Sequence, residues 1–245
     1  MNHISTTRRV QRVRHDLLAR EVQVSRVERI SPGFLSLTFR GESLASFVSL
    51  SFDDHVKLIL QDASGVSHKR DFTPRHFDVQ KRELTLEFAL HDNGIACQWA
   101  RQAQVGDSAV IGGPRGSMIV PADYDWHVLA GDASALPAIH RRVEELPEGS
   151  HALVLVQLPQ PDDIRVFQSR ANLQLQWLAT EDAFVQALRQ LSLPEGEGFI
   201  WCAGEAHAMA LAREAVLVER QFPREATRIS AYWKAGAADY HEPKD

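Results

Sequence analysis

The chain has 245 residues, of which 44% are hydrophobic and 24% are charged, and its formal net charge is −5. This length is enough for one large domain or two small ones with a sizeable core. The mildly acidic balance argues against general nucleic-acid binding, and the lack of a long apolar run argues against a membrane-spanning helix.

Residues 1–17 are a basic N-terminal arm, which carries Arg8, Arg9, Arg12 and Arg14. The arm lacks the apolar middle part of a signal peptide, and its simplest interpretation is a solvated or partly disordered segment. The only two cysteines, Cys97 and Cys202, show neither metal-like spacing nor the framework of a secreted domain. We therefore expect a cytoplasmic protein.

Strand patterns dominate the first half of the chain. Apolar and polar residues alternate over 34–39, 55–60 and 83–91, with turn signals between these segments, and only 94–103 has a helical pattern. Several short strands with turns between them predict an antiparallel β-barrel or sandwich over residues 18–122.

From about residue 124, short apolar strands alternate with helical segments. The predicted strands are 126–131, 151–158, 173–179, 198–204 and 228–233, and the predicted helices are 134–146, 181–191 and 205–222. This alternation predicts a mostly parallel sheet. The fold class is thus a two-domain β + α/β protein, with the α/β domain and a C-terminal tail over residues 123–245.

The segment RDFTPR, residues 70–75, concentrates unusual chemistry. The arginines, Arg70 and Arg75, match the oxygens of a phosphate, and Phe72 can pack against a planar heterocycle. The hydroxyl of Thr73 can bond a ring nitrogen. Together these groups suit a flavin with its phosphates, but a turn with two solvated arginines explains the same residues.

The first strand–helix corner of the second half, AGDASALPAI at 130–139, places a glycine before a helix. The free N–H groups at a helix start can hold a phosphate. The usual GxGxxG fingerprint is missing, however, and a glycine at such a corner often serves only to turn the chain. Asp132 is favoured as a cap of the following helix rather than as a ligand contact.

Segment 70–75 resembles the flavin signature of the ferredoxin–NADP reductase superfamily, in the variant typical of the siderophore-interacting proteins. That family consists of FAD-dependent ferric-siderophore reductases. The resemblance extends in order over about residues 20–236. It includes the segments 53–60, 88–117, 129–139, 201–209 and 231–236.

The resemblance implies a set of FAD contacts. Arg70 matches the arginine that binds the phosphates or orients the flavin, and Arg75 is the second arginine, with Asp71 inside the same motif. Phe72 replaces the aromatic residue against the isoalloxazine and lacks a tyrosine hydroxyl. Thr73 stands where a hydroxyl residue reaches the flavin N5 region.

Further cofactor contacts follow from the same resemblance. The start of the 94–103 helix would bring backbone N–H groups to the pyrophosphate, through Gly94, Ile95 and Ala96. Gly116 and Ser117 would add contacts after the glycine-rich loop. His91 matches a family position, although a histidine at a strand end is more often only hydrogen-bonded than catalytic.

On the nicotinamide side, the resemblance implies cofactor contacts from Asp132, Ser134 and Ala135. The same resemblance makes the α/β domain, residues 123–245, the nucleotide-binding domain. Trp233 would cover the flavin, although a core tryptophan is slightly favoured for this position. Cys202 is favoured as a buried, inert thiol over one near the nicotinamide. An NADPH preference would need arginines after the second parallel strand, where Arg165 and Arg170 lie. Solvated loop arginines explain that pair equally.

The implied function is electron transfer from NADPH or NADH, through FAD, to the Fe(III) of a siderophore, which loosens the chelate because Fe(II) is held less tightly. We assign no catalytic residue and no permanent metal site. Substrate contacts are expected from Lys57, Arg228 and Lys234, as a local positive pocket for anionic chelates; exposed strand lysines are the alternative.

Rival functions stay open. One is a flavin reductase, or a reductase with a protein acceptor; another is a siderophore carrier without turnover. Ferredoxin is an alternative electron donor, and a monomer is expected.

Overall fold

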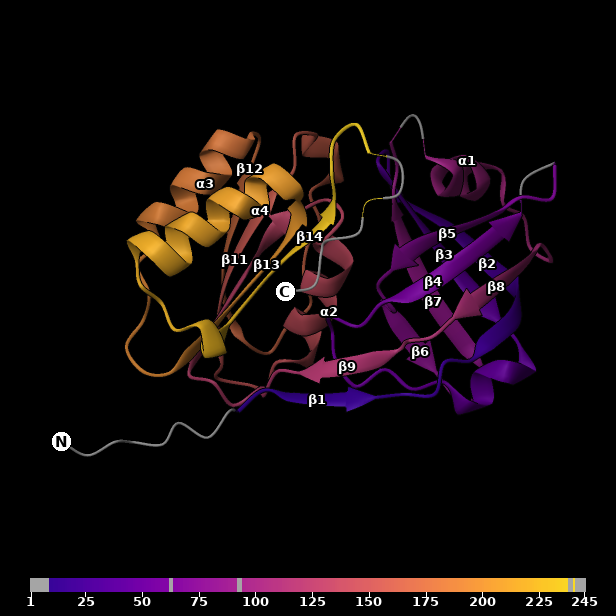
Figure 1. The fold of residues 1–245 in the computed structure, drawn as a ribbon, viewed down its shortest axis with the longest axis horizontal. Coiled ribbons are helices and arrows are strands. Elements are labelled where there is room, and N and C mark those ends of the chain that lie inside the picture. Colours follow the sequence, from indigo (N-terminus) through magenta and orange to yellow (C-terminus); the bar gives the residue numbers. More distant parts are fainter. Residues whose placement is uncertain (1–8, 62–63, 92–93, 238–239, 241–245) are drawn as a thin grey trace.

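A computed structural model describes residues 9–61, 64–91, 94–237 and 240. It contains an antiparallel sheet in the first half of the chain and a parallel sheet in the second (Figure 1). The first is a seven-stranded antiparallel sheet with the order β5-β4-β8-β2-β3-β7-β6. Its elements are β2 (Ala19–Ser31), β3 (Phe34–Arg40), β4 (Val56–Gln61), β5 (Ser67–Phe72), β6 (His76–Asp78), β7 (Glu83–Ala89), α1 (Ile95–Gln102) and β8 (Ser108–Gly112). The predicted antiparallel domain is therefore confirmed.

Alternation explains how this sheet curls into an open barrel. In β3 and β7 the inward residues are apolar and fully buried, including Leu37, Leu84 and Leu86. The two edges of the sheet approach each other, since the ring of Phe72 in β5 lies 4.4 Å from that of Phe88 in β7. A curled sheet encloses these side chains more completely than a flat one, which stabilises the barrel.

The second sheet is parallel, with five strands in the order β12-β11-β10-β13-β14. Its elements are β10 (Trp126–Asp132), α2 (Leu136–Glu145), β11 (His151–Gln157), β12 (Asn172–Leu178), α3 (Glu181–Gln190), β13 (Gly198–Glu205), α4 (Ala206–Arg213) and β14 (Thr227–Trp233). Because the chain runs outward from β10 in both directions, the strand order reverses between β10 and β13. In folds of this kind ligands bind beyond the carboxyl ends of the strands at that point.

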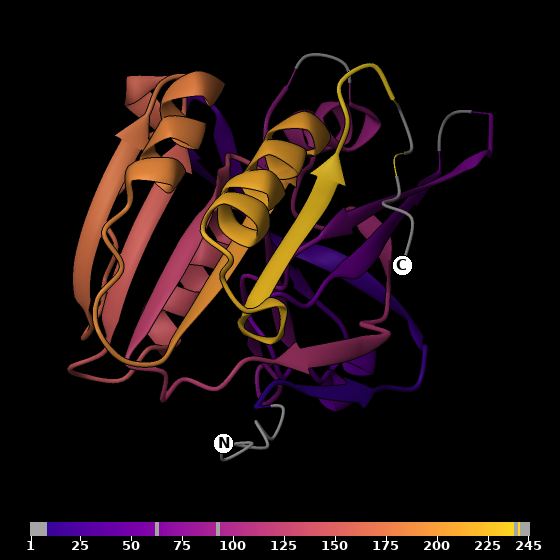
Figure 2. The same cartoon turned by 60° about the vertical axis from the view of Figure 1, so that its left-hand side comes forward.

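Helices cover both faces of the parallel sheet (Figure 2). One face packs against α2 and, beyond it, against Phe34 and Phe52 of the barrel domain. The other face packs against α3 and α4. The helix predicted over 205–222 differs from this structure, because α4 ends at Arg213 and continues as a π-helical segment, Glu214–Glu219.

The described part of the basic arm also differs from the solvated segment expected. Strand β1 (Gln11–Arg14) pairs antiparallel with β9 (Gly116–Ile119), which lies in the connection between the two sheets (Figure 1). The guanidinium of Arg9 forms ion pairs with Asp123 at 2.5 Å and Glu197 at 2.7 Å. The strand forms because β9 offers an unpaired edge and because carboxylates meet the arginine.

No helix among the described residues is long and apolar enough to cross a membrane.

A buried histidine in β10 makes folding sensitive to acid. His127 is 1% exposed, and burial together with the nearby charge of Arg142 lowers its pKa to about 4. The unfolded chain takes up a proton below the ordinary pKa of 6.5, whereas the folded chain does so only near 4. The contribution of neutral His127 to the free energy of unfolding is therefore fully present above pH 6.5. It falls between pH 6.5 and 4, by up to about 1.4 kcal/mol per pH unit.

Urea unfolding of the wild type and of His127→Phe, measured from pH 7.5 to 4.5, tests this expectation. The wild type should lose more stability than the variant over the acid half of that range. Parallel pH profiles for the two proteins would contradict it.

Candidate functional site

The flavin-motif residues lie at the end of β5. Phe72 is half-buried against Phe88, and Arg70 donates a hydrogen bond from Nη1 to the carbonyl of Lys69 at 2.8 Å. Thr73 follows the strand; its side chain is buried, and its hydroxyl makes no hydrogen bond to any residue that the structure describes. The hydroxyl is not among the fully buried polar atoms without a partner, so it can reach a ligand at the surface of the site.

Helix α1 lies at the same end of the barrel. The ring of its Trp99 lies 6.4 Å from that of Phe88, so one aromatic cluster joins the helix to Phe72. Gly94 precedes the helix and provides no side-chain cap. A Cβ on Gly94 would meet the ring of His91, which is exposed and could shift at little cost.

The donors at this end of the barrel fit an anionic flavin cofactor. The first turn of α1, which includes Ile95 and the buried Ala96, leaves backbone N–H groups without a side-chain cap. The guanidinium of Arg70 and the free hydroxyl of Thr73 add a charged donor and a neutral one. The resemblance implied FAD contacts from these residues, and the structure connects the end of β5 to α1 through the rings of Phe72, Phe88 and Trp99. Their contacts with the cofactor stay a prediction.

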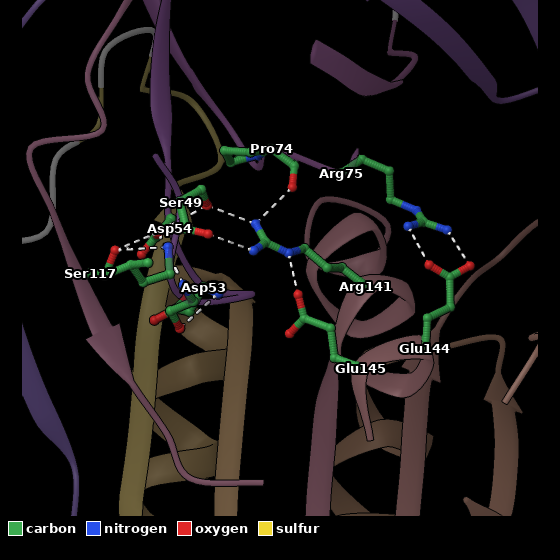
Figure 3. Close-up of polar contacts among 11 residues, drawn as sticks. Ser49, Asp53, Asp54, Pro74, Arg75, Ser117, Arg141, Glu144 and Glu145 are labelled. Carbon is green, nitrogen blue, oxygen red and sulfur yellow. Dashed lines mark hydrogen bonds and ion pairs between the residues drawn. The ribbon is translucent and has the colours of Figure 1, made fainter. Parts of the chain in front are cut away.

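Arg75 does not join this group of donors. Its Nη1 and Nη2 donate to the two carboxylate oxygens of Glu144 in α2, at 2.7 and 2.8 Å (Figure 3). Its Nε forms an ion pair with Glu87 of β7 at 3.2 Å. The second arginine of the motif therefore bridges the two domains in this structure.

Arg165 also pairs with Glu87, at 2.6 Å, and its side chain is buried. It is thus neither the solvated loop arginine nor the exposed phosphate ligand considered from the sequence. Arg170 is exposed.

Ser117 lies in a buried polar network rather than at an open surface (Figure 3). Its hydroxyl donates to Asp54 at 2.6 Å, accepts from the backbone N–H of Leu50, and lies 2.8 Å from Nε2 of His15. Burial raises the pKa of Asp54, although hydrogen bonds from Ser117 and Ser49 act against this. The neighbouring Gly116 allows β9 to approach β1, since a Cβ there would meet the carbonyl of Val13.

Arg141 is an organising residue that the sequence did not reveal (Figure 3). From α2 it donates to the hydroxyl of Ser49 at 2.8 Å, the carbonyl of Ser49 at 3.1 Å and the carbonyl of Pro74 at 3.0 Å. Its Nε also bonds Glu145 within the helix. In the sequence, HRRVEEL shows only a helical pattern, and these partners are distant along the chain.

In the α/β domain, Asp132 lies at the carboxyl end of β10 and joins three neighbouring segments by hydrogen bonds. Its Oδ1 accepts from the N–H and the hydroxyl of Ser134, and its Oδ2 accepts from the N–H of Glu205 and from Nε1 of Trp233, both at 2.8 Å. The expected helix cap is therefore wrong in detail: α2 begins only at Leu136, and Asp132 instead organises the turn before it.

Close packing surrounds this turn. Ala135 is fully buried, and a Cβ on Gly131 would collide with Ala135 and with the carbonyl of Ala203. The glycine therefore serves the chain geometry of the corner. Cys202 is fully buried, and burial raises its pKa to about 12, which makes it an inert thiol.

Strand β14 connects the parallel sheet to the barrel domain. Tyr232 donates to Asp53 at 2.8 Å, and Asp53 lies just before β4, whose Val56 pairs with Phe72. Trp233 is 44% exposed at the end of β14. The favoured interpretation of Trp233 as a core tryptophan is therefore wrong, and its contact with the flavin stays a prediction.

The three expected substrate cations differ in their partners. Lys57 forms an ion pair with Asp71 at 2.7 Å, and Arg228 forms one with Asp53 at 3.5 Å. Lys234 is exposed and has no carboxylate partner among the described residues. Of the three, Lys234 therefore carries the least compensated charge.

Comparison with known proteins agrees with this geometry. The siderophore-interacting FAD-binding domain matches residues 23–68 and 64–118, and the siderophore-interacting protein model matches residues 124–236. An NADPH-dependent ferric-chelate reductase of Escherichia coli K12 is 38% identical, over 94% of this chain and 99% of its own length. The ferric vibriobactin reductase ViuB of Vibrio cholerae is 28% identical, over 89% of this chain and 91% of its own.

Among solved structures, a siderophore utilization protein from T. fusca has a TM-score of 0.89 and 30% identity, and the match covers 95% of this chain and 98% of that one. The similarity thus spans both domains. On these grounds the chain belongs to the siderophore-interacting protein family, with an FAD-binding domain and the ferredoxin-reductase-like fold.

Proposed function

We propose that the protein is an FAD-dependent ferric-siderophore reductase that takes electrons from NADPH and releases iron as Fe(II). The observation that carries this proposal is the donor set at one end of the barrel, formed by Arg70, Thr73 and the uncapped start of α1. The similarity to a ferric-chelate reductase over nearly the full length of both chains supports it.

The chain's own residues bind and orient the cofactor. Arg70 and the N–H groups of Gly94 to Ala96 hold the phosphates, while Phe72 and Thr73 orient the ring. Bound FAD supplies the conversion between a two-electron nicotinamide donor and a one-electron iron acceptor. Trp233, fixed by Asp132, lies at the edge of the parallel sheet, where it can shield the ring from water.

A positive pocket at the junction attracts anionic chelates. Lys57 and Arg228 contribute partly neutralised charge, and Lys234 contributes a charge that no described carboxylate compensates. Because hard oxygen ligands hold Fe(II) less tightly than Fe(III), reduction lets the metal leave without an acid or base from the protein.

Lys234→Ala is expected to raise the KM for an anionic ferric chelate about three- to tenfold while changing the KM for a neutral chelate much less, since it removes a long-range attraction. Steady-state kinetics with matched chelates of the two kinds measure this. Lys81→Ala, which removes a lysine paired with Asp78 on the barrel, is the control. Equal effects of Lys234→Ala on the KM for both chelates would contradict the proposed positive pocket.

Trapping of ferrous iron tests the function itself. The FAD-loaded protein should produce Fe(II) from a ferric siderophore in a catalytic, NADPH-dependent reaction, with NADH compared side by side. Binding of the ferric chelate without turnover would instead favour a carrier, and turnover with free flavin alone would favour a flavin reductase.

We further propose that the enzyme works as a cytoplasmic monomer. Cys97 and Cys202 are both buried and unpaired, as suits a reducing compartment.

A further inference from the structure

Helix α2 connects the two halves of the candidate site. Its amino end follows the Asp132 turn, where Trp233 is held. Its carboxyl half contacts the end of the flavin motif, through Arg141 to the carbonyl of Pro74 and through Glu144 to Arg75 (Figure 3). Helix α2 therefore connects the end of the flavin motif, residues 70–75, with the turn at Asp132, where we expect the nicotinamide cofactor.

The contacts of Arg75 engage both Nη groups of its guanidinium, while its buried Nε makes no hydrogen bond to the described residues. Glu144 takes one oxygen to each Nη in a two-pronged pair, and Glu87 lies 3.2 Å from Nε. The Arg75 side chain is only 11% exposed, whereas that of Glu144 is 39% exposed. A phosphate would have to displace Glu144 to reach this arginine, and two-pronged pairs are among the strongest in proteins.

The groups around Glu144 keep it ionised. They are Arg75, His140 at 3.3 Å and, beyond Arg75, the Glu87–Arg165 pair. Although burial acts to raise the pKa of Glu144, hydrogen bonds from His140 and Arg75 lower it to about 2. The pair with Arg75 is therefore intact throughout the physiological range.

We propose that Glu144 and Arg141 are positioning residues that hold the end of the flavin motif, residues 70–75, against α2. Arg75 is then the barrel's partner in this contact rather than a phosphate ligand. We call the contacts of Arg75 with Glu144 and of Arg141 with Pro74 the lock. The lock fixes the flavin motif relative to the Asp132–Trp233 edge. The inference rests on the proposed function, because its purpose is to hold two cofactor sites at one separation. A small change of separation strongly affects transfer between bound groups.

Arg75→Gln, Glu144→Gln and the double variant test the proposal, with Glu219→Gln as the matched control. Glu219 pairs with Arg189 at 3.1 Å inside the α/β domain, away from the barrel. Three quantities are measured for each protein: the Kd for FAD with apoprotein, amide hydrogen exchange over residues 71–78 and 136–145, and the single-turnover rate of flavin bleaching by NADPH.

The lock predicts the same phenotype for both single variants. The FAD Kd stays within about threefold of wild type, exchange in both segments rises about tenfold, and the bleaching rate falls about tenfold. Because the two residues form one pair, the double variant resembles each single variant. The control leaves all three quantities unchanged.

Two outcomes would overturn the lock. If Arg75→Gln weakens FAD by more than about tenfold while Glu144→Gln does not, Arg75 is a phosphate ligand. If exchange and bleaching stay at wild-type values in both variants, the pair holds nothing in position. A wild type that binds FAD but reduces no ferric chelate would refute the proposed function, and the FAD and exchange measurements would still decide the lock.

Discussion

Replacing Arg70 with alanine is expected to raise the Kd for FAD about ten- to hundredfold. Arg70 lies near the end of β5, on the same face of the strand as the half-buried Phe72, where its guanidinium can make charge-assisted hydrogen bonds to the cofactor phosphates. Such bonds contribute about 1.5–3 kcal/mol each, which corresponds to this range of affinity. Titration of the apoprotein with FAD, followed by flavin fluorescence, measures the effect.

Lys69→Ala is the control for this experiment. Lys69 precedes Arg70 in the same strand and is exposed, so its loss tests whether a nearby positive charge alone accounts for the affinity. The control should retain FAD nearly as well as wild type. An Arg70→Ala protein with full flavin occupancy at wild-type affinity would remove Arg70 from the cofactor site.

Arg141→Met is expected to lower the free energy of unfolding by about 3 kcal/mol, because it removes one member of a buried, hydrogen-bonded charge cluster. The substitution keeps most of the apolar stem but leaves the carbonyls of Ser49 and Pro74 without this donor. It also isolates Glu145 from its partner. Urea denaturation measures the loss.

Arg189→Met is the matched comparison, because the pair of Arg189 with Glu219 is partly exposed. Exposed pairs contribute at most about 1 kcal/mol, so this variant should remain close to wild type. If the two variants lose the same small amount of stability, the Arg141 cluster does not hold the domains together.

Strand alternation predicted much of the fold. The segments 34–39, 83–91 and 126–131 became β3, β7 and β10 nearly at their predicted bounds, because each buries a continuous apolar face. The sequence pattern did not predict β5 as a strand. Its residues, SHKRDF, are largely polar, since an edge strand with one exposed face needs few apolar side chains.

The site was predictable where its residues are neighbours in sequence. The motif over 70–75 brings its own arginine, aromatic ring and hydroxyl together, whatever the rest of the chain does. The pairs that fix this motif join residues far apart: Arg75 and Glu144 are separated by 69 positions, and Asp53 and Tyr232 by 179. No local pattern encodes such a pair, so the role of Arg75 as a bridge emerged only from the structure.

The central claim is that FAD lies at the junction of the two domains, held by the end of β5 and the start of α1. A crystal structure of the protein reconstituted with FAD tests it most directly. The account predicts one cofactor per chain, with its phosphates at Arg70 and the first turn of α1 and its ring beside Phe72 and Thr73, facing Trp233. A cofactor bound elsewhere, or a junction that takes up no FAD under reconstitution, would contradict it.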